Sequence, residues 1–204
     1  MQRAIDAGHG QGHEEEHHTS TGLDNRKLLM WAFLGSECLF FGSLISTYML
    51  YRGQSIVGPY PDDVYNIPYT SVSAFVLLMS SLTMVLALAA IQRGDHTGLR
   101  IWLAATALLG AVFVGGQVFE FTEFLHHGLE LSTNLFGTSL FVLTGFHGLH
   151  VTLGIVILLS LFVMSWRGQL PQRDSLTVEI AGLYWHFVDI IWIIIFTLVY
   201  LIPN

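Results

Sequence analysis

The stretch Leu131–Trp166, LSTNLFGTSLFVLTGFHGLHVTLGIVILLSLFVMSW, contains no Asp, Glu, Lys or Arg in 36 consecutive residues. An α-helix crosses the hydrocarbon core of a bilayer with about 20 mostly apolar residues. The stretch is therefore long enough to cross a membrane once with residues to spare. It predicts a membrane-spanning helix that begins near Phe136 and ends at Trp166.

Four other stretches have the same character. Tyr69–Ile91 and Ile101–Phe119 carry no charge, Leu28–Tyr51 is interrupted only by Glu37, and Ile180–Pro203 only by Asp189. No stretch alternates strictly between apolar and polar residues, as a membrane strand does. The sequence therefore predicts an all-α integral membrane protein, a bundle of five transmembrane helices at about 27–51, 69–92, 100–121, 136–166 and 178–202.

The five spans define one membrane domain, residues 26–204, because no internal linker is long enough to divide it. Residues 1–25 form a polar, acidic tail that we predict to be disordered. The tail does not resemble a cleavable signal peptide, so the first span is expected to direct insertion. The tail histidines, His9, His13, His17 and His18, are interpreted either as a chelator or as part of a solvated segment.

Basic residues are divided unevenly between the two sides of the predicted membrane domain. Cytoplasmic loops of membrane proteins carry an excess of Lys and Arg. One side holds seven of the eight basic residues: Arg3, Arg26, Lys27, Arg93, Arg100, Arg167 and Arg173. The other side holds Arg52. We therefore predict a cytoplasmic N-terminus and a C-terminus outside.

Several ionisable residues lie at central depth in the predicted spans, where a charge costs about 2.5–3.5 kcal/mol. Glu37 is roughly 15 Å into its span at the rise of an α-helix. His147 and His150, and likewise His186 and Asp189, are three residues apart and share a helix face. From matched depth we expect Glu37 to hydrogen-bond His150, and from spacing we expect His186 to pair with Asp189.

Two interpretations of these histidines are open: a metal or haem site, and a hydrogen-bonded polar cluster that fixes helix register. Glu37 is interpreted as a proton-handling group, a lipid partner or a buried donor. A third possibility joins His147 and His150 to the acids and histidines at the outer end of the third span, as in membrane di-iron desaturases: Glu120, Glu123, His126 and His127.

Other classes of function have less support. A transporter is the main alternative, although the spans show neither a repeat nor a mid-helix proline. The net charge of −7 argues against a nucleic-acid partner. The single cysteine, Cys38, forms no internal disulfide and does not suffice for a dinuclear copper site.

Beyond these physical arguments, four motifs together resemble subunit III of the haem–copper terminal oxidases, the cytochrome c oxidase and quinol oxidase family. The resemblance covers Asn25–Asn204. The motifs occur in this order: Trp31–Phe41 (WAFLGSECLFF), Gln117–Glu120 (QVFE), Gly137–Ser139 leading into Gly145–Val151 (GFHGLHV), and Tyr184–Trp192 (YWHFVDIIW).

This resemblance implies a non-redox subunit of an aerobic oxidase that reduces O₂ to water and pumps protons in the bacterial inner membrane. In the family, subunit III holds no haem, copper or other metal, and these cofactors lie in partner subunits I and II. Subunit III packs beside subunit I, binds phospholipid, and supports proton uptake and stability during turnover. Five spans correspond to a short bacterial form that lacks the first two of seven helices.

The resemblance also assigns roles to single residues. Glu37 falls on the family's buried carboxylate, known for carbodiimide reactivity, and His150 on a histidine near it. Glu120 is the acid at the outer end of the third span. Many members carry an arginine at the position of Met164, whereas this chain has Arg167 three residues later, a candidate lipid-headgroup contact.

Overall fold

The computed structural model describes residues 24–52, 66–126, 128–129 and 134–202. Within these ranges the chain forms five long helices: α1 (Asn25–Tyr51), α3 (Ile67–Gln92), α4 (His96–His126), α5 (Leu135–Trp166) and α6 (Ser175–Phe196). A 3₁₀ turn, η1 (Gln172–Asp174), precedes α6, and a π-helical turn, η2 (Thr197–Leu201), follows it. All five helices are long and apolar enough to cross a membrane, which confirms the predicted five-helix membrane protein. The histidine-rich tail and His127 lie outside the described residues.

Three helices end at a glycine with positive φ: Gly94 (φ 75°), Gly128 (φ 79°) and Gly168 (φ 70°). In each case the next residue donates its N–H to the carbonyl five residues before it, as Asp95 does to Ala90. This is the Schellman arrangement, which favours glycine because a side chain disfavours that backbone conformation. The cap at Gly94 gives α3 and α4 a tight connection, since α4 begins at His96.

The third span is longer than the predicted 100–121. The α4 helix begins at His96, after Asp95 accepts the N–H of Gly98 at 2.9 Å, and it continues to His126. Charged side chains at both ends of the helix remain compatible with it because they lie near the polar surface of a bilayer. Apolar composition alone therefore underestimates the length of a spanning helix.

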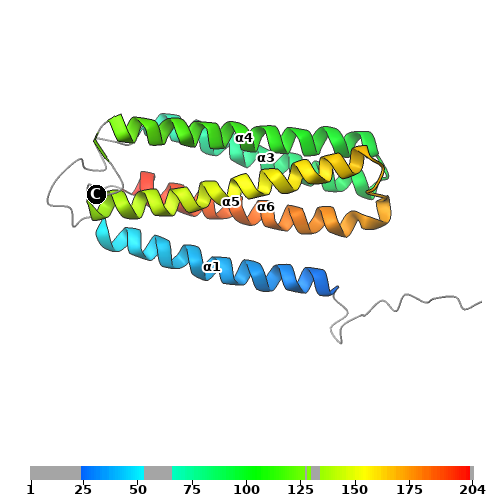
Figure 1. Ribbon diagram of the computed structural model, residues 1–204, viewed down its shortest axis with the longest axis horizontal. Helices are drawn as coiled ribbons and strands as arrows, with labels where there is room; N and C mark the ends of the chain where they lie inside the picture. The colour runs from blue at the N-terminus through cyan, green and yellow to red at the C-terminus, as the bar shows by residue number, and fades with distance from the viewer. Residues whose placement is uncertain (1–23, 53–65, 127, 130–133, 203–204) are drawn as a thin grey trace, which may run out of the picture.

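The helices pack as two unequal groups on either side of α5 and α6 (Figure 1). The α3 and α4 helices pair and contact α6 and α5, whereas α1 lies on the opposite side against α5 and α6. Only 11% of the α1 span is buried, against 56% of the span Gln172–Leu201. The last span is thus the central element and α1 the peripheral one.

Trp185 joins the four central helices. Its side chain is 1% exposed, and its indole Nε1 donates to the Ser80 hydroxyl of α3 at 2.9 Å. The ring lies between Gly110 of α4 and Gly154 of α5. A methyl group at Gly110 would lie 2.5 Å from the indole, and one at Gly154 would lie 2.8 Å from it. Both glycines are therefore required for the close approach of the three helices around α6.

Charged contacts fix the ends of the peripheral α1 helix. Lys27 pairs with Glu179 near the start of α6. At the other end, the Arg52 guanidinium donates to the carbonyls of Leu198 and Ile202. Because α1 buries little apolar surface within this chain, these two contacts help to hold its position beside α6 and η2.

We predict that Gly154→Ala destabilises the bundle, because the added methyl group would overlap the Trp185 indole. Overpacking of this kind costs about 1–3 kcal/mol. Thermal unfolding of the purified protein in detergent, followed by near-ultraviolet circular dichroism, measures the change. Gly145→Ala is the matched control on the same helix, since no atom lies within 4 Å of a methyl group there. Equal melting temperatures for the two variants would contradict the proposed role of Trp185.

Candidate functional site

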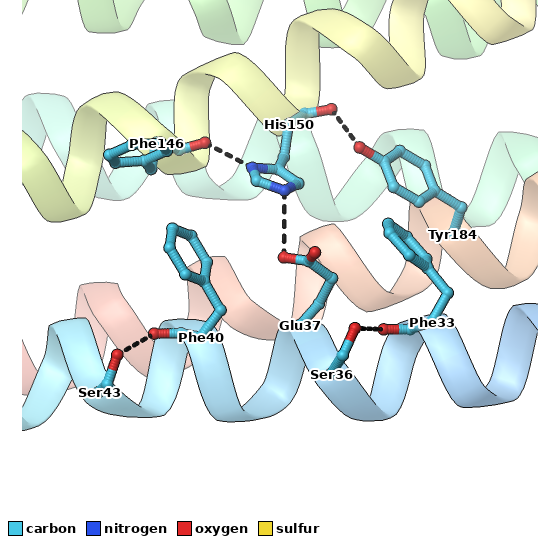
Figure 2. Close-up of polar contacts among 8 residues, drawn as sticks. All are labelled: Phe33, Ser36, Glu37, Phe40, Ser43, Phe146, His150 and Tyr184. Carbon is cyan, nitrogen blue, oxygen red and sulfur yellow. Dashed lines mark hydrogen bonds and ion pairs between the residues drawn. The ribbon is translucent and has the colours of Figure 1, made fainter.

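The central polar contact of the α1–α5 interface joins Glu37 to His150 (Figure 2). His150 Nε2 lies 3.3 Å from Glu37 Oε2, and the two side chains are 13% and 18% exposed. The two side chains therefore meet, as their matched depth predicted, but the expected hydrogen bond between them is not formed. Their approach is a polar contact and not an aligned hydrogen bond, because Glu37 Oε2 has no donor of good geometry among the described residues.

The hydrogen bond of the His150 ring indicates which of its nitrogens carries hydrogen. Its Nδ1 lies 2.7 Å from the Phe146 carbonyl, which can only accept, so Nδ1 carries hydrogen. Without a further proton, Nε2 and a Glu37 carboxylate oxygen would face each other with two lone pairs. One further proton, on the carboxyl group or on the imidazole, would remove this repulsion. Carboxyl and imidazole groups are the side chains that most often transfer protons in proteins, so the pair is a candidate proton-handling site.

Aromatic rings surround the pair from three helices. The Phe41 ring centroid lies 5.0 Å from that of His150, and Phe40 packs edge-on against Phe146 at 5.2 Å. The Tyr184 hydroxyl of α6 donates to the His150 carbonyl at 3.0 Å, and its ring stacks on Phe33. Figure 2 shows Glu37 between the Phe33 and Phe40 side chains, pointing from α1 toward His150. The surroundings of the pair are therefore apolar, although both side chains remain partly exposed.

His147 occupies a different environment from His150. Its side chain is fully buried, its Nε2 lies 3.1 Å from the Val188 carbonyl, and its ring packs against Phe113 and Trp192. Gly148 next to it permits the approach of Gln117 from α4, whose Nε2 donates to the Thr144 carbonyl at 2.8 Å. His147 is thus part of the packed core between α4, α5 and α6.

The expected pairing of His186 with Asp189 is wrong. His186 Nδ1 lies 2.6 Å from the Ser81 hydroxyl of α3, and Ser81 is also a partner of Asp189. The side chains of successive helix turns both reach toward the neighbouring helix, where one hydroxyl serves them. Sequence spacing placed the two residues on one face but gave no sign of Ser81, which lies 105 positions from His186.

The four residues predicted as one polar cluster therefore contact three different neighbours. His150 faces α1, His147 faces the interior, and His186 and Asp189 face α3. Within the described ranges, no three His, Cys, Asp or Glu residues converge as ligands for a metal ion. The residues lie at similar depths in the bundle, as predicted, but their side chains do not form one cluster.

Glu120 and Arg167 lie at opposite ends of the bundle. Glu120 is 6% exposed, and its Oε1 accepts from the Thr70 hydroxyl of α3 at 2.7 Å. The Tyr200 hydroxyl of η2 is a second partner. Glu120 thus links α3, α4 and η2 at the end near the C-terminus. Arg167 is exposed just beyond α5, and its backbone N–H bonds to the Val163 carbonyl at 3.0 Å.

Comparison with known proteins identifies the family. The profile of the family described as cytochrome c oxidase subunit III matches residues 9–203. The quinol oxidase subunit 3 of Bacillus subtilis is 40% identical over 187 residues, 91% of each chain. The cytochrome c oxidase subunit 3 of Bacillus sp. PS3 is 36% identical over 177 residues, 87% of this chain and 86% of its own.

A third relative, the cytochrome bo(3) ubiquinol oxidase subunit 3 of Pseudomonas aeruginosa, is 36% identical over 194 residues, 95% of this chain and 92% of its own. Relatives of similar identity are thus named for quinol and for cytochrome c. These names and the five spanning helices identify a multi-pass bacterial membrane protein, a non-catalytic subunit of a terminal oxidase, and they do not favour a transporter or a metalloenzyme. This chain belongs to the cytochrome c oxidase subunit III family.

Proposed function

We propose that this subunit supports proton uptake and stability of the oxidase during turnover, and that the Glu37–His150 pair is the site of that role. The observation that carries the proposal is the 3.3 Å contact between Glu37 Oε2 and His150 Nε2 in the central part of the bundle. The pair joins a carboxyl group and an imidazole, is partly exposed, and lies on the side where α1 leaves most of its surface open.

The redox chemistry belongs to the partners. We propose that haem and copper are held by subunits I and II of the complex, and that this chain supplies no ligand to them. Bound phospholipid fits the apolar surface beside α1. Arg167, which follows the last residue of α5, is the proposed contact for a lipid phosphate. We further propose a cytoplasmic N-terminus, which places Arg167 at the cytoplasmic surface. Either electron donor is compatible with this role.

We predict that Glu37→Ala shortens the active lifetime of the oxidase more than it lowers the initial rate. Removal of the carboxyl group leaves His150 Nε2 without its polar partner and removes one of the two proposed proton-handling groups. Continuous oxygen-consumption traces of the purified complex with saturating electron donor measure both quantities. Ser36→Ala is the matched control, because Ser36 lies next in the chain and its hydroxyl bonds to the Phe33 carbonyl of its own helix. Equal loss of initial rate and lifetime would count against a supporting role.

A second prediction concerns the partners. Purification in mild detergent through a tag on this chain should recover a complex with the absorbance of reduced haem. Separation of the partner subunits should then leave this chain colourless. Haem that remained with the isolated chain would reject the assignment of cofactors to the partners. A colourless chain recovered alone, with crosslinking before detergent extraction also giving no partner, would reject membership in an oxidase complex.

A further inference from the structure

We propose that the α3–α6 face around His186 is the docking surface for a transmembrane helix of a partner subunit, which hydrogen-bonds His186 from outside the bundle. The inference rests on the proposed function, since it assigns a surface to one partner of the complex. Its starting point is that His186 is only partly buried and lies in the middle of α6, at the same level as the middle of α3.

The two nitrogens of the His186 ring have different surroundings among the described residues. Nδ1 lies 2.6 Å from the Ser81 hydroxyl. Nε2 has no hydrogen bond to any described residue. It is also not one of the fully buried polar atoms that lack a partner, so it is accessible at the surface of this chain. The two ring nitrogens point in different directions, so the bond to Ser81 on α3 leaves Nε2 directed toward the surface. An imidazole nitrogen facing hydrocarbon without a partner is unfavourable by several kcal/mol on transfer scales that allow no hydrogen bond.

The surrounding surface is apolar and exposed on both helices. Leu78 (37% exposed) and Val85 (50%) lie on the same face of α3 as Ser81, three residues before it and four after it. Ile190 (55%) lies one turn after His186 on α6. This combination, a hydrogen-bonding group centred in an apolar membrane face, matches a helix that carries one polar side chain among apolar ones.

Lipid does not meet the requirement of this face. Acyl chains have no hydrogen-bond donor or acceptor at mid-bilayer depth, and headgroups lie at the surface. Exposed serines on other helices differ from His186, because their hydroxyl groups hydrogen-bond to backbone carbonyls of the same helix. Ser43 of α1 donates to the Phe40 carbonyl, and Ser160 of α5 donates to the Val156 carbonyl. Those residues are satisfied in lipid, whereas His186 is not.

Next to this face, a buried carboxylate oxygen also lacks a hydrogen-bond partner among the described residues. Asp189 is 4% exposed, and its Oδ1 has no hydrogen-bond partner among the described residues. Ser81 is the hydroxyl that Asp189 and His186 share. A partner group that bonds to His186 fixes its ring, and so fixes which of the two residues receives the Ser81 proton. The partner we infer therefore carries Ser, Thr, Asn, Gln or Tyr at this depth.

Site-specific photocrosslinking in the intact complex tests the docking surface. A benzophenone amino acid replaces Ile190 or Val85 on the proposed face, and replaces Val156 on the exposed face of α5 as the control. After irradiation, haem absorbance of the tagged complex confirms that the oxidase is assembled. We expect protein adducts from positions 190 and 85, mapped by mass spectrometry to a spanning helix of one partner subunit, and no protein adduct from position 156.

Lipid adducts alone at positions 190 and 85, in a complex that retains haem, would overturn the docking surface while leaving the proposed function intact. Loss of haem from every preparation, the unsubstituted protein included, would instead overturn the proposed function, and the docking proposal with it. The two failures are therefore distinguished by the absorbance spectrum of the same sample.

Substitution of His186 gives an independent measurement. His186→Leu should weaken association with the partner roughly fivefold, as expected for the loss of one net hydrogen bond, whereas His186→Gln should retain most of it. The readout is the amount of haem retained per tagged chain during serial detergent dilution. Ser160→Leu on α5 is the control for a polar-to-leucine change at an exposed residue, because the Ser160 hydroxyl bonds to its own helix. Equal retention of haem by His186→Leu and the unsubstituted protein would overturn the proposal.

Discussion

The close approach of three helices around Trp185 is the constraint on which the rest of the structure depends. In a bilayer the hydrophobic effect does not hold helices together, because lipid tails are as apolar as leucine side chains. Packing and interhelical hydrogen bonds take its place. The indole supplies both, since it fills the space left by Gly110 and Gly154 and donates to Ser80. This contact sets the distances of α3, α4 and α5 from α6, and so the positions of the polar residues one turn away.

The position of Trp185 explains why neighbouring residues of α6 face three ways. Tyr184 reaches α5 and supports the backbone beside His150, while His186 reaches Ser81 of α3. Three consecutive residues of a helix point about 100° apart, so a tryptophan in the centre of the bundle directs its two neighbours to opposite flanks. One flank carries the Glu37–His150 pair, and the other carries the His186 face. The proposed proton site and the proposed docking surface are therefore separated by the core.

The α1 helix shows how a peripheral element is held without much burial. It contributes Glu37 to the pair with His150 and is fixed at its ends by Lys27 and Arg52. Most of its surface stays open within this chain. In a subunit of a larger complex this surface has lipid or other chains as its surroundings. The Glu37 carboxyl group consequently lies near the edge of the chain and not in its centre.

Much of the fold was predictable from local composition. The charge-free stretch 131–166 and its four counterparts predicted all five helices, and glycines after α3, α4 and α5 mark their ends. The match of depth between Glu37 and His150 also predicted their contact. By contrast, the extra turns of α4 were missed, because the charged residues at its ends hide the helix from a search for apolar segments.

The sequence by itself determined the number of spans, the depth of each ionisable residue and the family, because these depend on residue type, on the constant rise of a helix and on ordered motifs. Only the tertiary structure decided which of the residues at one depth meet. Depth is a single coordinate, and residues on five helices at equal depth can face any neighbour. The rotation of each helix about its axis, set by the packing around Trp185, sent His150 to Glu37, His147 to the Val188 carbonyl, and His186 to Ser81.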